Sequence, residues 1–416
     1  MTTHQVVFLL LDLALVIVLA RLLGVAARRI GQPPVIGEVL AGVLLGPSLL
    51  GEGFTAALFP VDVRPFLAVP ANIGVAVFMF VIGLELQRSQ ARGQGGLAAT
   101  VSISSILLPF ALGVALAFRL IANHPVEDRV GFTLFMGAAM SVTAFPVLAR
   151  ILADRGMLRT ALGGLALTCA AIDDVLAWTL LAVVVLLSGS GGPGMWLLLL
   201  CPVYVAVMFG AVRPLVGGLL GRGAELTGTK LALVVAGVLV SAAFTEWVGL
   251  HFVFGAFLFG VVVPREGTEA LRAALVDRVA EFNGALLLPV FFIVAGLKVN
   301  LSTIGWTGVL ELGLVLLAAI GGKFGGAFAA ARAHGVPARR SAALATLMNT
   351  RGLTELIILS VGLELGVLDR GLYSIMVVMA VVTTAMAGPL LNLVYPRGLV
   401  ERDRREAVER SGVGAG

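Results

Sequence analysis

Residues 165–187, LALTCAAIDDVLAWTLLAVVVLL, are long enough to cross a bilayer and carry two adjacent acidic residues near their middle. An ionisable side chain at the bilayer centre costs about 2.5–3.5 kcal/mol on insertion scales, so Asp173 and Asp174 need a partner or a function there. A low dielectric favours the protonated carboxyl, so such a group can hold a proton at one moment and a small cation at another. The pair therefore predicts competition between a cation and protons; the alternative is a structural pair that is hydrogen-bonded to neighbouring helices.

A basic residue at membrane depth is the natural partner of this pair. Lys323 lies in AAIGGKFGGAF, inside the apolar run 303–331, and the flanking glycines allow another helix to come close. We expect Lys323 to pair with one aspartate and to release it when a cation arrives. The alternative is that its side chain snorkels to the inner surface.

Two further apolar segments are interrupted by residues that break helices. GFTLFMGAAMSVTAFPVLARILAD contains Thr143 and Pro146, and SAALATLMNTRGLTELIILSVGLEL contains Asn349 and Arg351. Interrupted helices in matching places of two halves indicate a substrate site in transporters, although a proline kink and a snorkelling arginine are the alternative.

Hydroxyl and unwound carbonyl oxygens at such a break are hard ligands that suit Na⁺ or K⁺. We therefore expect Asp174, Asp173 and Thr143 to bind the cation. Thr168 could add a hydroxyl, unless it bonds its own helix backbone instead.

Arg351 could offset the helix-end dipoles where the broken helices meet, and Glu355, four residues on, could pair with it. Asp12 and Glu311 also lie at membrane depth, and a helix–helix hydrogen bond is the role we expect for them.

The composition requires that these residues sit in a polytopic membrane protein. The chain has 416 residues, is 59% hydrophobic and 13% charged, and has a mean hydropathy of +1.04. We predict an all-α protein with thirteen transmembrane helices. The predicted segments are 6–27, 34–50, 70–87, 97–121, 131–153, 160–187, 195–220, 230–248, 250–264, 281–297, 303–331, 340–362 and 370–395.

Charge predicts the orientation of these segments. If the N-terminus is outside, 21 of the 29 Lys and Arg residues fall in inner loops and the C-terminal tail, 5 in outer loops and 3 within spans. This places the C-terminus in the cytoplasm and the protein in the plasma membrane, which is the inner membrane of a bacterium. Six helices, one helix and six helices then give two halves of opposite orientation, which is the pattern of an inverted repeat.

Several function classes are disfavoured. The sequence has no G-x-x-x-x-G-K-[ST] phosphate loop, no H-E-x-x-H and no cluster of His and Cys. The G-x-G-D signature of intramembrane aspartyl proteases is also missing, so we do not expect an enzyme. The net charge of +5 is explained by loop arginines rather than by nucleic acid binding.

Seven motifs are spread along the chain from about Gln32 to Pro389. They are QPPVIGEVLAGVLLGPSLLG, FMFVIGLEL, SVTAFPVLARIL, AAIDDVLAW, HFVFGAFLFGVVVP, LLPVFFIVAGL and LMNTRGLTELIIL. Together they resemble the monovalent cation:proton antiporter-2 family, which includes bacterial Na⁺/H⁺ antiporters, K⁺/H⁺ exchangers and plant cation/H⁺ exchangers.

The resemblance implies a sodium/proton antiporter fold with two broken crossing helices, elevator-type alternating access and a homodimer. By motif, Asp174 matches the essential carboxylate that binds the ion and carries the proton. Asp173 matches a position that is Asp in many electrogenic members and Asn in others, and Lys323 matches the lysine that pairs with it. The set therefore favours electrogenic exchange.

The resemblance also implies a division of the chain. Residues 397–416 are a short charged tail, whereas glutathione-gated K⁺ efflux systems carry a nucleotide-binding domain there, so we do not expect gating of that kind. The implied parts are dimer-domain helices at 1–95 and 226–300, core helices at 96–190 and 301–396, and a linker helix at 191–225.

The function predicted from residues and resemblance is an antiporter that exchanges Na⁺, K⁺ or Li⁺ for protons and serves pH homeostasis. It needs no cofactor, and its partners are monovalent cations, protons and the lipid bilayer. The alternative is a cation channel or uniporter on the same scaffold, which would not need titratable carboxylates.

Overall fold

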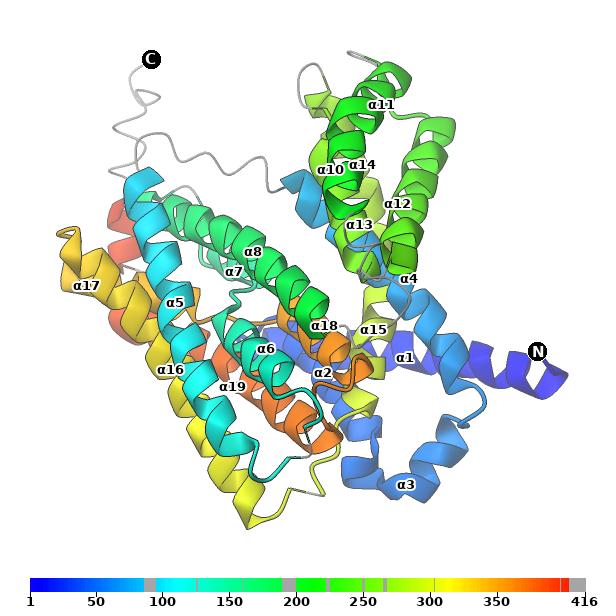
Figure 1. Cartoon of the computed structure of the whole chain (residues 1–416), viewed down its shortest axis with the longest axis horizontal. Coiled ribbons are helices and arrows are strands. Elements are labelled where there is room, and N and C mark those ends of the chain that lie inside the picture. Colours follow the sequence, from blue (N-terminus) through cyan, green and yellow to red (C-terminus); the bar gives the residue numbers. More distant parts are fainter. Residues whose placement is uncertain are drawn as a thin grey trace. The chain divides into compact units, whose positions relative to one another are not determined.

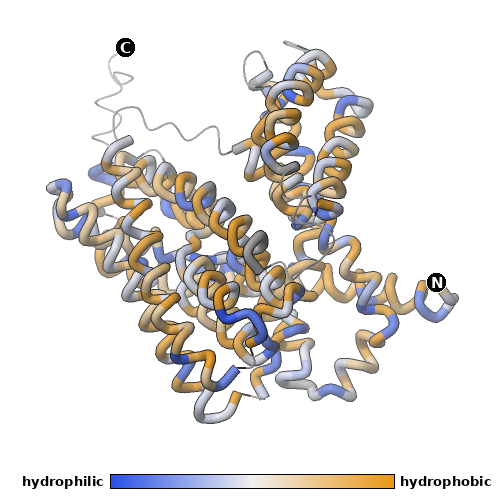
Figure 2. Tube along the Cα trace, in the orientation of Figure 1, coloured by the Kyte–Doolittle hydropathy of each residue, from blue (hydrophilic) through white to orange (hydrophobic). Residues whose placement is uncertain are grey.

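The chain folds into helices, as a computed structural model shows (Figure 1). The structure describes residues 1–85, 95–124, 126–158, 160–188, 200–221, 225–248, 251–264, 268–302, 304–396 and 398–403. Within these residues all regular elements are helical and no strand occurs. Hydrophobic residues dominate along most of the helices (Figure 2), which is the composition that a lipid environment requires.

The helices follow one another along the chain with short connections. Their bounds are α1 Thr3–Arg29, α2 Pro34–Leu45, α3 Pro47–Leu58, α4 Arg64–Glu85, α5 Gly95–Leu120, α6 Arg129–Ser141, α7 Phe145–Asp154, α8 Ala161–Ser188, α10 Leu200–Val207, α11 Arg213–Leu220, α12 Gly228–Val248, α13 Phe252–Val262, α14 Glu269–Phe282, α15 Leu288–Leu297, α16 Trp306–Ala333, α17 Ala338–Met348, α18 Leu353–Glu364 and α19 Arg370–Val394. Two π-helical turns, Met208–Val212 and Asn283–Leu287, join α10 to α11 and α14 to α15.

The predicted fold class, an all-helical polytopic membrane protein, is confirmed. Among the described residues, ten helical stretches are long and apolar enough to cross a membrane. The other predicted segments correspond to the short helices α2 and α13 and to the interrupted pair α17 and α18. The number of thirteen spans and the inverted repeat stay predictions.

Two boundaries differ from the predicted segments. The segment 34–50 ends as a helix at Leu45, because Gly46 is extended before Pro47, and a residue that precedes proline avoids the helical region. The segment 281–297 begins twelve residues earlier than predicted, at Glu269. Its first part, EALRAALVDRVAEF, is rich in residues that favour helix but is too polar to count as an apolar run.

The described part of the chain divides into two compact units. The first contains Met1–Arg21, Leu50–Arg88 and Val185–Val294, and the second contains Leu22–Leu49, Ser89–Val184 and Ala295–Gly416. The roles of dimer domain and core stay predictions. Parts of the predicted linker (189–199 and 222–224) and of the tail (397 and 404–416) lie outside the described residues.

The first unit is held together by close backbone contact between α4 and α13. A Cβ atom on Gly83 would lie 2.2 Å from the carbonyl oxygen of Phe257, and one on Gly260 would lie 2.2 Å from that of Phe80. Small residues at both positions let the two helices touch along their backbones, which is a common way to pack helices in membranes.

The second unit is built around α5 and α16, which lie side by side (Figure 1). A Cβ atom on Gly322 would lie 2.7 Å from the Cα of Pro109, and one on Gly326 would lie 2.3 Å from the carbonyl oxygen of Ser104. These glycines flank Lys323 on either side, so α5 is the helix that the flanking glycines were expected to admit.

Candidate functional site

Two interrupted helices meet inside the second unit. The first interruption, Val142 to Ala144, is extended and separates α6 from α7. The second, Asn349 to Gly352, separates α17 from α18. The backbone N–H of Ala144 donates to the carbonyl of Thr350 at 3.0 Å, so the two interruptions touch through their own backbone. Such a junction leaves helix ends, with their dipoles, at membrane depth.

Asp173, on α8, is fully buried and receives several hydrogen bonds at this junction. Its Oδ2 accepts from Thr143 Oγ1 at 2.7 Å, from Lys323 Nζ at 2.9 Å and from Ser105 Oγ at 3.1 Å. The donors belong to the first interruption, to α16 and to α5. The carboxylate therefore ties three separate elements to α8.

Lys323 is also fully buried, so it does not snorkel to a surface. Its ammonium group donates to Thr143 Oγ1 at 2.5 Å as well as to Asp173. Thr143 Oγ1 in turn lies 3.0 Å from the carbonyl of Met348, at the end of α17. The structure thus brings together Asp173, Lys323 and Thr143.

Asp174 is the next residue, is equally buried, and differs completely in its contacts. Neither of its carboxylate oxygens receives a hydrogen bond from a side chain of the described residues. Asp173 and Lys323 are its charged neighbours, and the backbone N–H of Phe145, at the start of α7, is a donor that faces it. A buried carboxylate with so few hydrogen bonds is costly although the N-terminus of α7 partly offsets its charge, so a proton or a cation that neutralises it would stabilise the site.

Arg351 and Glu355 form a second buried ion pair beside the junction. Arg351 Nη1 donates to Glu355 Oε2 at 2.8 Å, and both side chains are fully buried. The same guanidinium donates to the carbonyls of Ala139 and Met140 at 2.7 and 2.6 Å, which are the last turn of α6. The positively charged side chain of Arg351 therefore covers the negative end of the broken helix α6, which is the role expected for this arginine.

The remaining expected residues are placed in different ways. Pro146 lies in the first turn of α7, where its missing N–H costs nothing. Asn349 directly follows α17, and its amide lies 3.8 Å from the sulfur of Met386. Thr168 donates to the carbonyl of Gly164 in its own helix at 2.9 Å, as an ordinary helix threonine does.

Ser105 is the contact of Asp173 that sequence reasoning missed. It lies in SISSILLPF on α5, fully buried, and the motif contains three serines with nothing to distinguish this one. A helical projection of α5 against α8 is the signal that could have selected it, because Ser102 and Ser105 lie one turn apart on one face.

A second charged group, which we call the loop cluster, consists of Asn123, His124, Glu311 and Asp369. His124 Nδ1 lies 2.5 Å from Asp369 Oδ2 and its Nε2 lies 3.1 Å from Glu311 Oε2, while Asn123 Nδ2 donates to Glu311 Oε1 at 2.6 Å. Glu311 thus bonds the turn that follows α5 and not another helix, so the contact differs from the helix–helix hydrogen bond expected for it. The hydrogen bond to Asp369 raises the pKa of His124, burial opposes this shift, and Glu311 adds to it.

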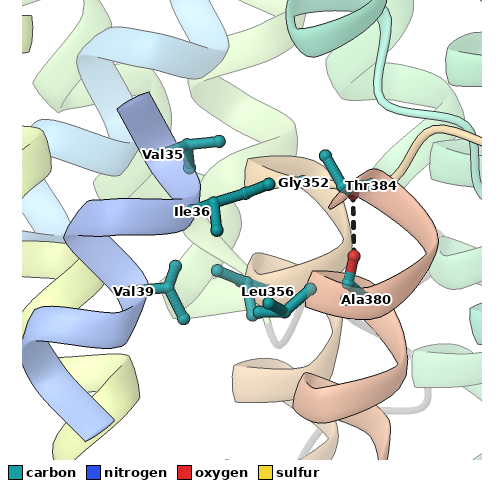
Figure 3. A pocket seen from close by; sticks show the side chains of 8 residues that line it. Val35, Ile36, Val39, Gly352, Leu356, Ala380 and Thr384 are labelled. Atoms are coloured by element: carbon teal, nitrogen blue, oxygen red, sulfur yellow. Dashed lines mark hydrogen bonds between the residues drawn. The ribbon is translucent and has the colours of Figure 1, made fainter. Parts of the chain in front are cut away.

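An apolar hollow is lined by α2, α18 and α19 and by Gly352, at the end of the second interruption. Figure 3 shows Val35, Ile36 and Val39 facing Gly352 and Leu356, with Ala380 and Thr384 beside them. The hollow contains none of the charged groups above, and we do not regard it as the ion site.

The chemistry of the junction is that of hard oxygen ligands. It offers carboxylate, hydroxyl and backbone carbonyl oxygens, which suit alkali cations. Among the described residues, no group of three or more His, Cys, Asp or Glu side chains is arranged to hold a resident metal ion.

Comparison with known proteins agrees with this chemistry. The family model "Sodium/hydrogen exchanger, transmembrane" matches residues 14–395. The chain is 40% identical to the Na(+)/H(+) antiporter NhaS4 of Synechocystis sp., over 95% of this chain and 99% of that protein. It is 40% identical to Cation/H(+) antiporter 20 of Arabidopsis thaliana and 32% identical to K(+)/H(+) antiporter 1 of Saccharomyces cerevisiae. Both alignments cover 93% of this chain but only 48% and 46% of those longer proteins.

A solved structure shows the same fold at low sequence identity. The sodium proton antiporter MjNhaP1 from Methanocaldococcus jannaschii superimposes with a TM-score of 0.66 and 16% identity, over 95% of this chain and 99% of that chain. Because the family model spans nearly the whole chain and the cyanobacterial relative is matched along its full length, the chain belongs to the sodium/hydrogen exchanger family of multi-pass membrane proteins.

Proposed function

We propose that the protein is a secondary antiporter that exchanges a monovalent cation for protons across the membrane, and that both compete for Asp174. The observation that supports this most directly is the contrast between two adjacent buried carboxylates. Asp173 accepts hydrogen bonds from the side chains of Ser105, Thr143 and Lys323, whereas Asp174 accepts none from a side chain of the described residues and faces only the backbone N–H of Phe145. A carboxylate without a side-chain partner at the junction of two broken helices can take its partner from solution.

The charges at the junction support a monovalent substrate. When all side chains are ionised, Asp173, Asp174 and Glu355 carry one negative charge more than Lys323 and Arg351. While Lys323 stays protonated, one proton or one monovalent cation on Asp174 neutralises this excess, whereas a divalent cation would leave a buried positive charge. In that form the two substrates can occupy the same site alternately at similar electrostatic cost; if Lys323 is deprotonated as the cation binds, one negative charge remains.

The number of protons exchanged depends on Lys323. If the arriving cation also takes Asp173 as a ligand, Lys323 loses its partner in a low-dielectric site and releases a proton of its own. The exchange then moves two protons for one cation and is electrogenic. If the ion pair of Asp173 with Lys323 stays closed, the exchange is one for one. We favour the electrogenic form, with access alternating by an elevator-type movement of the helices that carry the junction.

The names of the relatives support cations as the substrate class but do not identify which cation this chain transports. Their names refer to exchange of Na⁺, of K⁺ and of cations in general for H⁺. We propose Na⁺, K⁺ or Li⁺ as the substrate of this chain, a homodimer as its assembly, and the plasma membrane as its location with the C-terminus in the cytoplasm. No catalytic step is part of the proposal.

Proton movement in proteoliposomes with an imposed pH gradient tests the proposal. Na⁺, Li⁺, K⁺ or choline is added in turn to vesicles that contain the native protein or Asp174→Asn. We expect at least one alkali cation to collapse the gradient in the native vesicles, choline to have no effect, and Asp174→Asn to lose the response by about 100-fold or more. A variant that exchanges as well as the native protein would refute competition at Asp174.

The same vesicles separate the alternatives of mechanism. With the membrane potential clamped by K⁺ and valinomycin, an electrogenic exchanger responds to an imposed potential and a one-for-one exchanger does not. A channel or uniporter would conduct the cation without any pH gradient and would keep its current in Asp174→Asn.

A further inference from the structure

The inference concerns Ser105 on α5, which contacts the paired aspartate rather than the unpaired one. Its hydroxyl lies 3.1 Å from Asp173 Oδ2 and 3.3 Å from Asp173 Oδ1, so it is the donor placed within reach of both carboxylate oxygens. Ser105 and Asp173 are both fully buried. Where both groups are buried, a hydroxyl at this distance still compensates part of the carboxylate charge.

The other two donors to Asp173 have competing partners. Thr143 Oγ1 accepts from Lys323 and also lies 3.0 Å from the carbonyl of Met348, so its proton can turn away from the carboxylate. Lys323 is the group that the proposed exchange requires to let go of Asp173. Ser105 also has an alternative acceptor, the carbonyl of Ser102 at 3.0 Å in its own helix, but the proposed exchange does not require it to release Asp173.

Ser105 is also held in place by the packing of α5 on α8. One turn before it, Ser102 donates to the carbonyl of Cys169 at 2.7 Å, and Cys169 lies one turn before Asp173. On the other side, α5 touches the backbone of α16 at Gly322 and Gly326. The hydroxyl of Ser105 is therefore presented to Asp173 by a helix that is fixed on two sides.

We infer that Ser105 is a positioning residue of the exchange, which holds the carboxylate of Asp173 towards the junction so that Lys323 and the incoming cation can alternate on it. This inference rests on the proposed function. Without the serine hydroxyl, the negative charge of Asp173 is compensated by Lys323 and Thr143 alone, and the ion pair with Lys323 becomes tighter. The cation must then displace a stronger competitor, so its apparent affinity falls.

The test compares two buried serines on the same helix. Ser105→Ala removes the donor to the carboxylate, and Ser102→Ala removes a donor to a backbone carbonyl, with the same change in size. The KM for NaCl and for KCl is measured in proteoliposomes at one fixed pH. In parallel, the thermal midpoint of the purified protein is measured at increasing concentrations of NaCl or KCl, with choline chloride as the reference. The half-stabilising concentration is the salt concentration that gives half of the maximal rise of this midpoint.

We expect Ser105→Ala to raise both the KM and the half-stabilising concentration by about tenfold, the change that ~1.4 kcal/mol corresponds to. The maximal rate should change much less. Ser102→Ala should lower thermal stability and change both cation constants much less than Ser105→Ala does, because the backbone contacts of Gly322 and Gly326 still hold α5 on α16. Ser105→Thr, which keeps the hydroxyl, should have nearly native constants.

The two readouts separate this inference from the proposed function. If Ser105→Ala keeps native constants, or if Ser102→Ala changes them equally, the positioning role is wrong even when exchange is intact. If the cation stabilises the native protein but moves no protons, the antiporter proposal fails, and a raised half-stabilising concentration in Ser105→Ala still supports the role of Ser105.

Discussion

The junction of the broken helices and the loop cluster are two charged groups supported by the same pair of helices, α5 and α16. Helix α16 carries Lys323 in the first and Glu311 in the second; α5 carries Ser105, and Asn123 and His124 follow its end. In the loop cluster all four carboxylate oxygens are engaged, since Asp369 Oδ1 also accepts from the N–H of Leu372. At the junction, both oxygens of Asp174 and one of Glu355 lack a side-chain hydrogen-bond partner among the described residues, and the backbone N–H of Phe145 faces Asp174.

This difference in hydrogen bonding indicates different roles for the charges of the loop cluster and those of the junction. A buried charge whose hydrogen bonds are complete holds its neighbours in one arrangement, whereas one whose bonds are incomplete lowers stability until something binds it. We therefore expect the loop cluster to contribute to stability, and the contrast supports the role in exchange proposed for Asp174. The contrast can be tested by removing individual members of each group.

The largest loss is expected for Arg351→Met. The substitution leaves Glu355 as an unpaired buried carboxylate, which alone costs about 3–5 kcal/mol, and it frees the carbonyls of Ala139 and Met140 as well. We expect little folded protein by size-exclusion chromatography in detergent. The double variant Arg351→Met with Glu355→Met should recover part of the yield, since no charge is then left unpaired. Equal yields of single and double variants would contradict the importance of this ion pair.

The next largest effect distinguishes the two adjacent aspartates by thermal stability in choline chloride. Asp173→Asn leaves Lys323 buried beside an uncharged amide and should cost about 3–5 kcal/mol. Asp174→Asn removes a buried charge that has no side-chain hydrogen bond and keeps an oxygen that can accept from the N–H of Phe145, so its thermal midpoint should equal or exceed the native value. If the two variants fall by the same amount, the contrast between a paired and an unpaired carboxylate is wrong.

The smallest effect is expected in the loop cluster and depends on pH. Because the folded-state pKa of His124 is raised, its contribution to stability is complete below its unfolded value of about 6.5 and is lost as the pH rises through the folded value. Burial raises the pKa of Asp369, but the hydrogen bonds from His124 and from the backbone outweigh it and lower that pKa below its usual value. Its contribution is therefore lost only when the pH falls through that lowered value.

We call the contacts of His124 with Asp369 and Glu311 the charged bridge. It contributes fully to stability between about pH 4 and 6.5. We expect His124→Gln to lower the thermal midpoint by roughly 2–4 °C at pH 5.5 and by less at pH 9. Arg150→Gln, in an exposed pair with Asp154, is the matched control and should change little at either pH. A pH-independent loss in His124→Gln would exclude the charged bridge.

The sequence was most informative where residues violate the rules of a membrane span. Asp173, Asp174, Lys323 and Arg351 are conspicuous because each is costly in lipid, and helix-breaking residues marked the two interruptions. The i,i+4 spacing of Arg351 and Glu355 predicted their ion pair, and that pair is present. The helical fold followed from hydropathy alone.

The sequence did not predict contacts that are made by residue types common in membrane helices and loops. Serine is common in membrane helices, so Ser105 could not be told from its neighbours before the packing of α5 on α8 was known. His124 and Asp369 lie 245 residues apart in loops, and no local pattern links them. Helix α14 was missed because its charges lower the hydropathy on which the spans were predicted, although its residues favour helix.

The mutual capping of the two interruptions has a consequence for how the protein is made. The carbonyls at the end of α6 are covered by an arginine that comes more than 200 residues later, and Thr143 meets the end of α17 across a similar distance. While the ribosome is still synthesising the second half, the first broken helix is already in the membrane with its polar backbone uncovered. The first half of the chain therefore cannot reach its final structure alone, and the two interruptions must complete each other late in biogenesis.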